Sequence, residues 1–144
     1  MLDEIQGLYD NFYHELKSYL LENSIYLPNV YKKEPENKKF PKVIIKELPR
    51  TSKYTTLVYT DELYNYGLEI NVYAIQNGNL ASATIGDEIA RWVEKFFKEI
   101  YRMTVKVSRD VPNSDTSVYR NLIQVRCLID TKYRDKLILL PIYE

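Results

Sequence analysis

The chain has 144 residues, of which 45% are hydrophobic and 28% charged, so it can bury the core of one domain without metals or crosslinks. Twenty lysine and arginine residues balance twenty aspartate and glutamate residues, and this neutrality argues against a general attraction to nucleic acid or to an anionic membrane. The single cysteine, Cys127, excludes an internal disulfide and is expected to be a small buried hydrophobe.

An amphipathic helix is predicted at the N-terminus. Apolar side chains recur at three- and four-residue intervals between Leu2 and Leu20, and the helix should end near Asn23 or Ser24. The segment has neither the basic region nor the uninterrupted apolar run of a signal peptide, and no part of the chain reaches the length of a membrane-spanning helix. We therefore expect a soluble intracellular protein.

Charge is divided unevenly between this helix and the segment that follows it. Residues 1–24 contain five acidic side chains and one lysine, whereas residues 31–53 contain eight basic side chains and three glutamates. The basic segment is either a solvated loop and strand edge or one half of a contact in which acidic and basic surfaces of neighbouring copies meet head to tail.

A linker and a first strand are predicted next. Residues 26–40 have no periodicity and predict a surface linker. The apolar run Lys42–Leu48, bounded by Pro41 and Pro49, predicts a strand. For Thr55–Thr60 a strand, an extended arm, or both in different states remain open.

A half-buried strand followed by an amphipathic helix gives the clearest pattern in the sequence. Apolar and polar residues alternate over Tyr64–Ile75, as on a strand with one buried face. After a Gln-Asn-Gly-Asn turn, Ser82–Tyr101 predicts a helix whose apolar stripe covers that strand. The stripe consists of Ile85, Ile89, Trp92, Val93, Phe96 and Ile100.

A β-hairpin is predicted in the last third of the chain. Residues 103–108 alternate as a strand, Val111–Asp115 has the composition of a turn, and residues 119–129 alternate as a long strand that pairs antiparallel with its predecessor. The apolar tail Leu137–Leu140 adds an edge strand or docks on a partner.

Together these elements predict an α+β fold in a single domain, residues 1–144. We expect a twisted, mainly antiparallel sheet of four to five strands with two helices packed on one face, in the order α-β-β-β-α-β-β.

No residue pattern predicts catalysis or metal binding. His14 is the only histidine and is expected at the surface, and the four glycines form no phosphate-binding loop. Of the two carboxylate pairs, Asp61-Glu62 lies in a polar loop. Asp87-Glu88 falls in the first turns of a helix that Ser82 or Thr84 should cap, where negative charge stabilises the helix dipole. We therefore predict no enzyme, cofactor or metal.

Four stretches of the sequence carry a family resemblance: Phe40–Leu48, Tyr66–Tyr73, the helix around Trp92, and Val111-Pro-Asn113 followed by Tyr119-Arg120. With the order of elements, they resemble the tail terminator (tail completion) proteins of long-tailed bacteriophages, especially those that infect Gram-positive hosts. The patterns are loose and span about residues 40–134.

The resemblance implies a structural, non-catalytic subunit. It implies a hexameric ring on the completed tail tube that stops tube growth and presents a surface to the head connector or head-closure protein. The implied partners are the protein itself, the tail tube protein and that head component, with DNA only passing through the lumen. Away from the tube, a monomeric state of the free chain stays open. The implied location is the host cytoplasm during assembly and then the virion tail or neck. Residues 50–63 are the expected arm towards a neighbour or the lumen. The candidate subunit or tail-tube interface residues are Lys38, Lys39, Lys42, Arg50, Lys53 and Tyr54.

Three alternatives stay open. The first is a ferredoxin-like nucleic-acid-binding module, because aromatic and basic groups are interleaved: Arg50 and Lys53 lie near Tyr54, Tyr59, Tyr64 and Tyr66. The second is a small enzyme that joins the Asp61-Glu62 loop to His14. The third is another phage neck or minor tail component.

Overall fold

The computed structural model describes the backbone of residues 2–32, 39–49, 51–55, 62–130 and 138–140, and the side chains of residues 7–32, 39–49 and 65–129. The described elements form an α+β fold, as predicted. In chain order they are α1 (Leu2–Asn23), β1 (Asn29–Tyr31), β2 (Lys42–Glu47), β3 (Thr51–Thr55), β4 (Glu62–Ala74), α2 (Ser82–Lys95), the π-helix η1 (Phe96–Ile100), β5 (Thr104–Val111), β6 (Tyr119–Asp130) and β7 (Ile138–Leu140).

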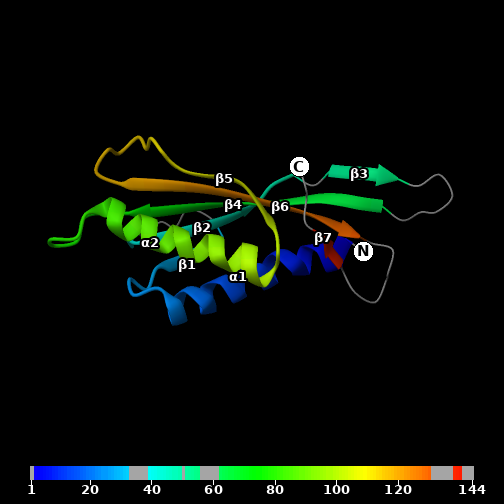
Figure 1. Ribbon diagram of the computed structural model, residues 1–144, viewed down its shortest axis with the longest axis horizontal. Coiled ribbons are helices and arrows are strands. Elements are labelled where there is room, and N and C mark those ends of the chain that lie inside the picture. Colours follow the sequence, from blue (N-terminus) through cyan, green and yellow to red (C-terminus); the bar gives the residue numbers. More distant parts are fainter. Residues whose placement is uncertain (1, 33–38, 50, 56–61, 131–137, 141–144) are drawn as a thin grey trace.

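The sheet is mixed and mainly antiparallel. Five strands lie in the order β1-β2-β4-β6-β5, and only the β1–β2 pair is parallel. β3 pairs with the beginning of β4, and β7 pairs with the end of β6. β3 lies at the end of the sheet that extends beyond the helices (Figure 1).

Two strands differ from the predicted order. β1 lies inside residues 26–40, which the sequence predicts as a linker, because three residues are too few for an alternating pattern to show. Its pairing with β2 buries Val30. Residues of the apolar tail form β7, which pairs with β6. Of the two predicted alternatives for the tail, the structure therefore shows the added strand. Of the ambiguous segment, only Thr55 is described, as the last residue of β3.

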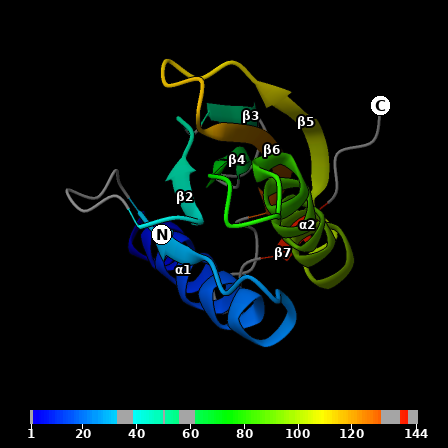
Figure 2. The same cartoon turned by 90° about the vertical axis from the view of Figure 1, so that its left-hand side faces the viewer.

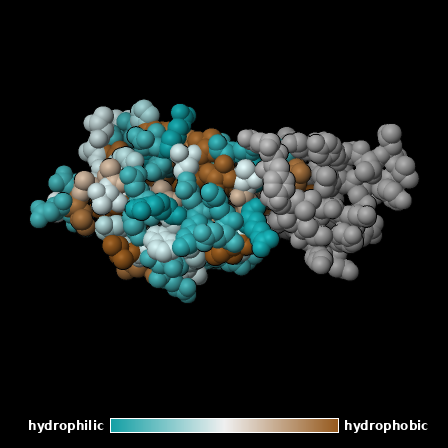
Figure 3. Space-filling view, viewed as in Figure 1, coloured by the Kyte–Doolittle hydropathy of each residue, from teal (hydrophilic) through white to brown (hydrophobic). Residues whose placement is uncertain are grey.

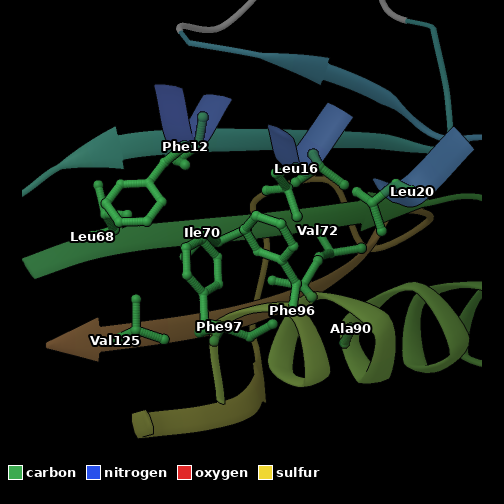
Figure 4. Close-up of a cluster of buried hydrophobic side chains, with 14 of the residues drawn as sticks. Phe12, Leu16, Leu20, Leu68, Ile70, Val72, Ala90, Phe96, Phe97 and Val125 are labelled. Carbon is green, nitrogen blue, oxygen red and sulfur yellow. The ribbon is translucent and has the colours of Figure 1, made fainter. Parts of the chain in front are cut away.

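Both helices pack on one face of the sheet, as predicted (Figure 2). Alternate side chains of β4 supply the middle of the core and are fully buried, which confirms the two-residue period. Figure 4 shows the side chains of Phe12 and Leu16 of α1 above Ile70 and Val72 of β4, and those of Phe96 and Phe97 below them, all within the same core. The buried β4 residues are Tyr66, Leu68, Ile70, Val72 and Ala74.

The second helix changes its geometry at Phe96. The sequence predicts one regular helix over Ser82–Tyr101, but α2 ends at Lys95 and the chain continues through the π-helical turn η1. A π turn holds more residues per turn than an α turn, so side chains from this turn onward no longer follow the spacing of the predicted apolar stripe. Phe97 is therefore fully buried, and Ile100, predicted in the stripe, is 53% exposed.

The predicted cap of the second helix is wrong. The N-cap residue is Ala81, and no side chain caps the helix there. Neither Asp87 nor Glu88 lies in the first turn. Their carboxylates make the hydrogen bonds described below.

Cys127 is buried in β6, as the sequence predicts. Burial raises the pKa of its thiol to about 12. Because the nucleophilic form of cysteine is the thiolate, this thiol is unsuited to chemistry at neutral pH.

Candidate functional site

The face of the sheet opposite the helices carries a row of aromatic and cationic side chains. The strand register places Lys42 of β2, Tyr73 of β4 and Arg120 of β6 directly beside one another. Phe40 precedes β2 at the same end of the sheet. We call Phe40, Lys42, Tyr73 and Arg120 the aromatic–cation row.

Cation–π contacts connect the row. The Lys42 ammonium lies 5.0 Å from the ring centroid of Phe40 and 5.1 Å from that of Tyr73. The Arg120 guanidinium lies 5.7 Å from the Tyr73 centroid. Each such contact contributes on the order of 0.5–2 kcal/mol, and more as the cation is desolvated. Lys42 is only 3% exposed, so its charge is held among these rings rather than in solvent.

Hydrogen bonds fix Arg120 from a second direction. Its Nε donates to Asn71 Oδ1 at 2.9 Å, and Asn71 Nδ2 donates to Glu69 Oε2 at 3.3 Å. Gln124 Nε2 donates to the other oxygen, Glu69 Oε1, at 3.1 Å. This network joins β4 to β6 and restricts the rotamers of Arg120 before any partner binds.

A groove of about 430 Å³ lies beside the row. Phe40, Lys42 and Tyr73 form part of its wall, and the loop between β5 and β6 forms much of the rest. Asp115 organises this loop, because its Oδ1 accepts hydrogen bonds from the backbone N–H of Ser117 at 3.0 Å and from the Ser117 hydroxyl at 2.6 Å. We call this feature the Tyr73 groove.

The groove gathers residues from three of the four stretches that carry the resemblance. Phe40, Tyr73 and Asn113 line it, and Arg120 contacts Tyr73 beside it. These residues are far apart in the sequence and meet only through the sheet register. Sequence reasoning missed Tyr73 and Arg120 as site residues. Their positions in two strands predicted to be long could have prompted a search for cross-strand pairs.

Of the six predicted interface residues, only Lys39 and Lys42 have described side chains. Lys39 is exposed, but Lys42 is buried in the aromatic–cation row, because its register opposite Tyr73 places it between two rings. Lys42 is therefore buried within its own subunit, and its place in an interface stays a prediction. Lys38 and Arg50 lie outside the described residues, as do the side chains of Lys53 and Tyr54.

The acidic helix and the basic segment meet within one subunit. Lys32, just after β1, forms an ion pair with Asp10 of α1. The Lys32 ammonium also lies 5.4 Å from the Tyr9 ring centroid and 5.1 Å from the Tyr13 centroid. For these two charges, the opposite signs of the two segments hold β1 beside α1 rather than joining neighbouring copies.

The carboxylates of Asp87 and Glu88 connect α2 to the rest of the fold. Glu88 accepts hydrogen bonds from the Ser24 hydroxyl at 2.8 Å and from Trp92 Nε1 at 2.6 Å. Asp87 Oδ1 accepts from the Tyr119 hydroxyl at 2.8 Å and from Asn121 Nδ2 at 3.2 Å. The sequence does not predict these hydrogen-bond partners.

The described residues contain no arrangement typical of a metal site. No group of three or more histidine, cysteine or acidic side chains is close enough there to hold a metal ion. His14 is exposed on α1, as predicted, with its ring 5.0 Å from the Tyr13 ring. The carboxylates of Asp61 and Glu62, on which the enzyme alternative depends, lie outside the described side chains.

The surface is polar with separate apolar areas. Figure 3 shows hydrophilic residues over most of the described surface in this view, interrupted by smaller apolar areas. At the end of α1, Leu21 and Ile25 are exposed, and so is Leu27, whose φ of 46° lies in the left-handed region. A leucine in this conformation is uncommon and costs free energy, so local packing must hold it there.

Comparison with known proteins identifies no relative. No model of a known protein family matches the chain, and no curated protein sequence matches it. In the part of the chain that the structure describes, no helix is both long and apolar enough to cross a membrane.

Proposed function

We propose that the protein is a tail terminator of a long-tailed phage, a structural subunit that caps the tail tube as a ring, ends its elongation and forms part of the head–tail interface. The observation that carries the proposal is the Tyr73 groove. Residues from three separate stretches that resemble this family converge there on one surface. The α+β fold with both helices on one face agrees with the same proposal.

The groove has properties of a preorganised docking surface. Tyrosine and arginine are the side chains that contribute most often and most strongly to protein–protein contacts. Here the Arg120 side chain is already oriented by Asn71, so binding a partner would cost little further side-chain entropy. The exposed apolar residues Leu21, Ile25 and Leu27 offer additional contact area at the end of α1. We assign the groove to the contact with the tail tube.

Capping of tail tubes tests this proposal. The tube protein of the same phage is polymerised with and without the purified chain, and tube lengths and tube ends are measured by electron microscopy. We expect the chain at low molar ratio to shorten the tubes and to form a ring at one end. Arg120→Ala should raise the concentration needed for capping by about 30-fold, as expected for a central interface residue worth about 2 kcal/mol.

Lys17→Ala provides the matched control, because Lys17 is exposed on α1. This variant should cap like the wild type, and circular dichroism should show that both variants are folded. Unchanged tube lengths with the wild-type chain would refute the proposal. Normal capping by Arg120→Ala would exclude the groove from the contact.

Binding to duplex DNA distinguishes the nucleic-acid alternative. The chain has no net charge, and a ring through which DNA slides should avoid phosphate contacts, because each one releases counterions and strengthens retention. We expect no measurable binding by fluorescence anisotropy at about 0.15 M salt, near physiological ionic strength. Sub-micromolar binding under these conditions would favour a nucleic-acid-binding module instead.

A further inference from the structure

A second groove, of about 470 Å³, lies between α2 and the edge strand β5. Asp87, Arg91 and Glu94 of α2 form one wall, and Arg109 and Asp110 of β5 form the other. Asn121 of β6 lies between them. We call this feature the Asp87 groove. Figure 2 shows α2 and β5 on one side of the fold, with β2 and α1 on the other.

A buried acceptor without a donor lies at this groove. Asn121 is 6% exposed, and its Nδ2 donates to Asp87 Oδ1. This hydrogen bond fixes the orientation of the amide, because a flipped amide would place its oxygen against the carboxylate. The remaining oxygen, Asn121 Oδ1, has no hydrogen-bond partner among the described residues. Such an acceptor is unusual in folded proteins and favours a ligand that carries N–H donors.

The charges around the groove favour the same kind of ligand. Three carboxylates, from Asp87, Glu94 and Asp110, face two guanidinium groups, from Arg91 and Arg109. Within the described part of the chain, neither Glu94 nor Asp110 has an ion-pair partner. An ammonium or guanidinium group entering here would gain carboxylate partners and bring N–H donors next to Asn121.

We propose that the Asp87 groove binds a lysine or arginine side chain of a second copy of this chain, from the basic segment that precedes and begins β2. Lys39 lies just before β2 and is exposed. Lys32 already pairs with Asp10 of its own α1, and Lys42 is buried. This assignment replaces the contact with an acidic first helix that charge composition alone suggested, and it rests on the ring of the proposed function.

The positions of the two surfaces suit a ring. The basic segment adjoins β2, and the Asp87 groove adjoins β5 at the other edge of the sheet. A contact between two different patches of the same subunit is heterologous, and it closes into a ring when repeated about a rotation axis. The charge pair sets the register of neighbouring copies, while the area around it supplies further contacts.

A charge swap tests this proposal. Ring formation on tail tubes and self-association in solution are measured for Lys39→Glu, for Asp110→Lys and for the double variant, by electron microscopy and by sedimentation velocity. Each single reversal should reduce ring yield at least tenfold by placing like charges together. The double variant should recover to within about twofold of the wild type, because it restores opposite charges across the contact.

Glu99→Lys serves as the control, since Glu99 is exposed on η1 outside the groove, and its ring yield should stay unchanged. Circular dichroism should show that every variant is folded, since all three side chains are exposed. Single variants with normal ring yield would refute the proposal. So would a double variant that stays impaired, or a wild-type chain that never self-associates. Self-association with rescue but without tube capping would support this contact and refute the tail terminator function, so the two failures are distinguishable.

Discussion

Replacing Phe97 with alanine is expected to lower the free energy of unfolding by about 3–5 kcal/mol, as for other fully buried aromatic side chains. The Phe97 side chain is 0% exposed. Its ring centroid lies 4.9 Å from that of Phe96 and 5.9 Å from that of Phe12. The truncation therefore leaves a cavity between both helices and the sheet. Equilibrium unfolding in guanidinium, followed by the fluorescence of Trp92, measures the loss.

Ile100→Ala is the matched control for the π turn. Ile100 is 53% exposed, so its truncation should change the free energy of unfolding by no more than about 0.5 kcal/mol. A regular α-helix over Ser82–Tyr101 predicts instead that Ile100 belongs to the buried stripe. A loss of several kcal/mol at Ile100, with little loss at Phe97, would contradict the π turn.

Alanine at Gly86 and at Gly7 should change stability in opposite directions, although both glycines lie in helices. A Cβ atom at Gly86 would lie 2.6 Å from Cδ1 and 2.9 Å from Cε1 of Tyr119. The ring would have to move and strain its hydrogen bond to Asp87. We expect Gly86→Ala to destabilise the fold by about 1–3 kcal/mol, since overpacking outweighs the higher helix propensity of alanine.

Gly7→Ala isolates the propensity effect. Apart from its chain neighbours and the backbone of its own helix, no described atom lies within 4 Å of the position that a Cβ would take at Gly7. The substitution should stabilise the fold by about 0.5–1 kcal/mol. Thermal and guanidinium unfolding of both variants provide the comparison. A stabilised Gly86→Ala variant would show that Tyr119 can leave its position at little cost.

Long periodic elements could be predicted from the sequence, whereas short ones could not. The bounds of α1 and the alternation of β4 and β6 agree with prediction, because each pattern repeats over many residues. β1 has three residues, and its formation depends on Pro41 and β2 rather than on its own composition. The π turn leaves no distinct local pattern, since both Phe96 and Phe97 are apolar.

The site could not be predicted from composition, because its residues meet only through the register between neighbouring strands. A lysine in a basic segment is usually solvated, but Lys42 lies opposite Tyr73, and this neighbour determines its environment. Asp87 and Glu88 likewise resemble helix-terminal acids until their partners Tyr119, Asn121, Ser24 and Trp92 are known. The overall α+β class needed no such information, because it follows from the order of the elements alone.

The π turn at η1 also has a consequence for how this chain should be compared with others. Relative to an α-helix, a π turn corresponds to the insertion of one residue. A related chain with a regular helix here would therefore be one residue shorter between Trp92 and Met103. An alignment without a single-residue gap would pair Phe97 with a position of different orientation. Placing that gap within Phe96–Ile100 keeps both Trp92, before the gap, and Met103, just before β5, in structurally equivalent positions.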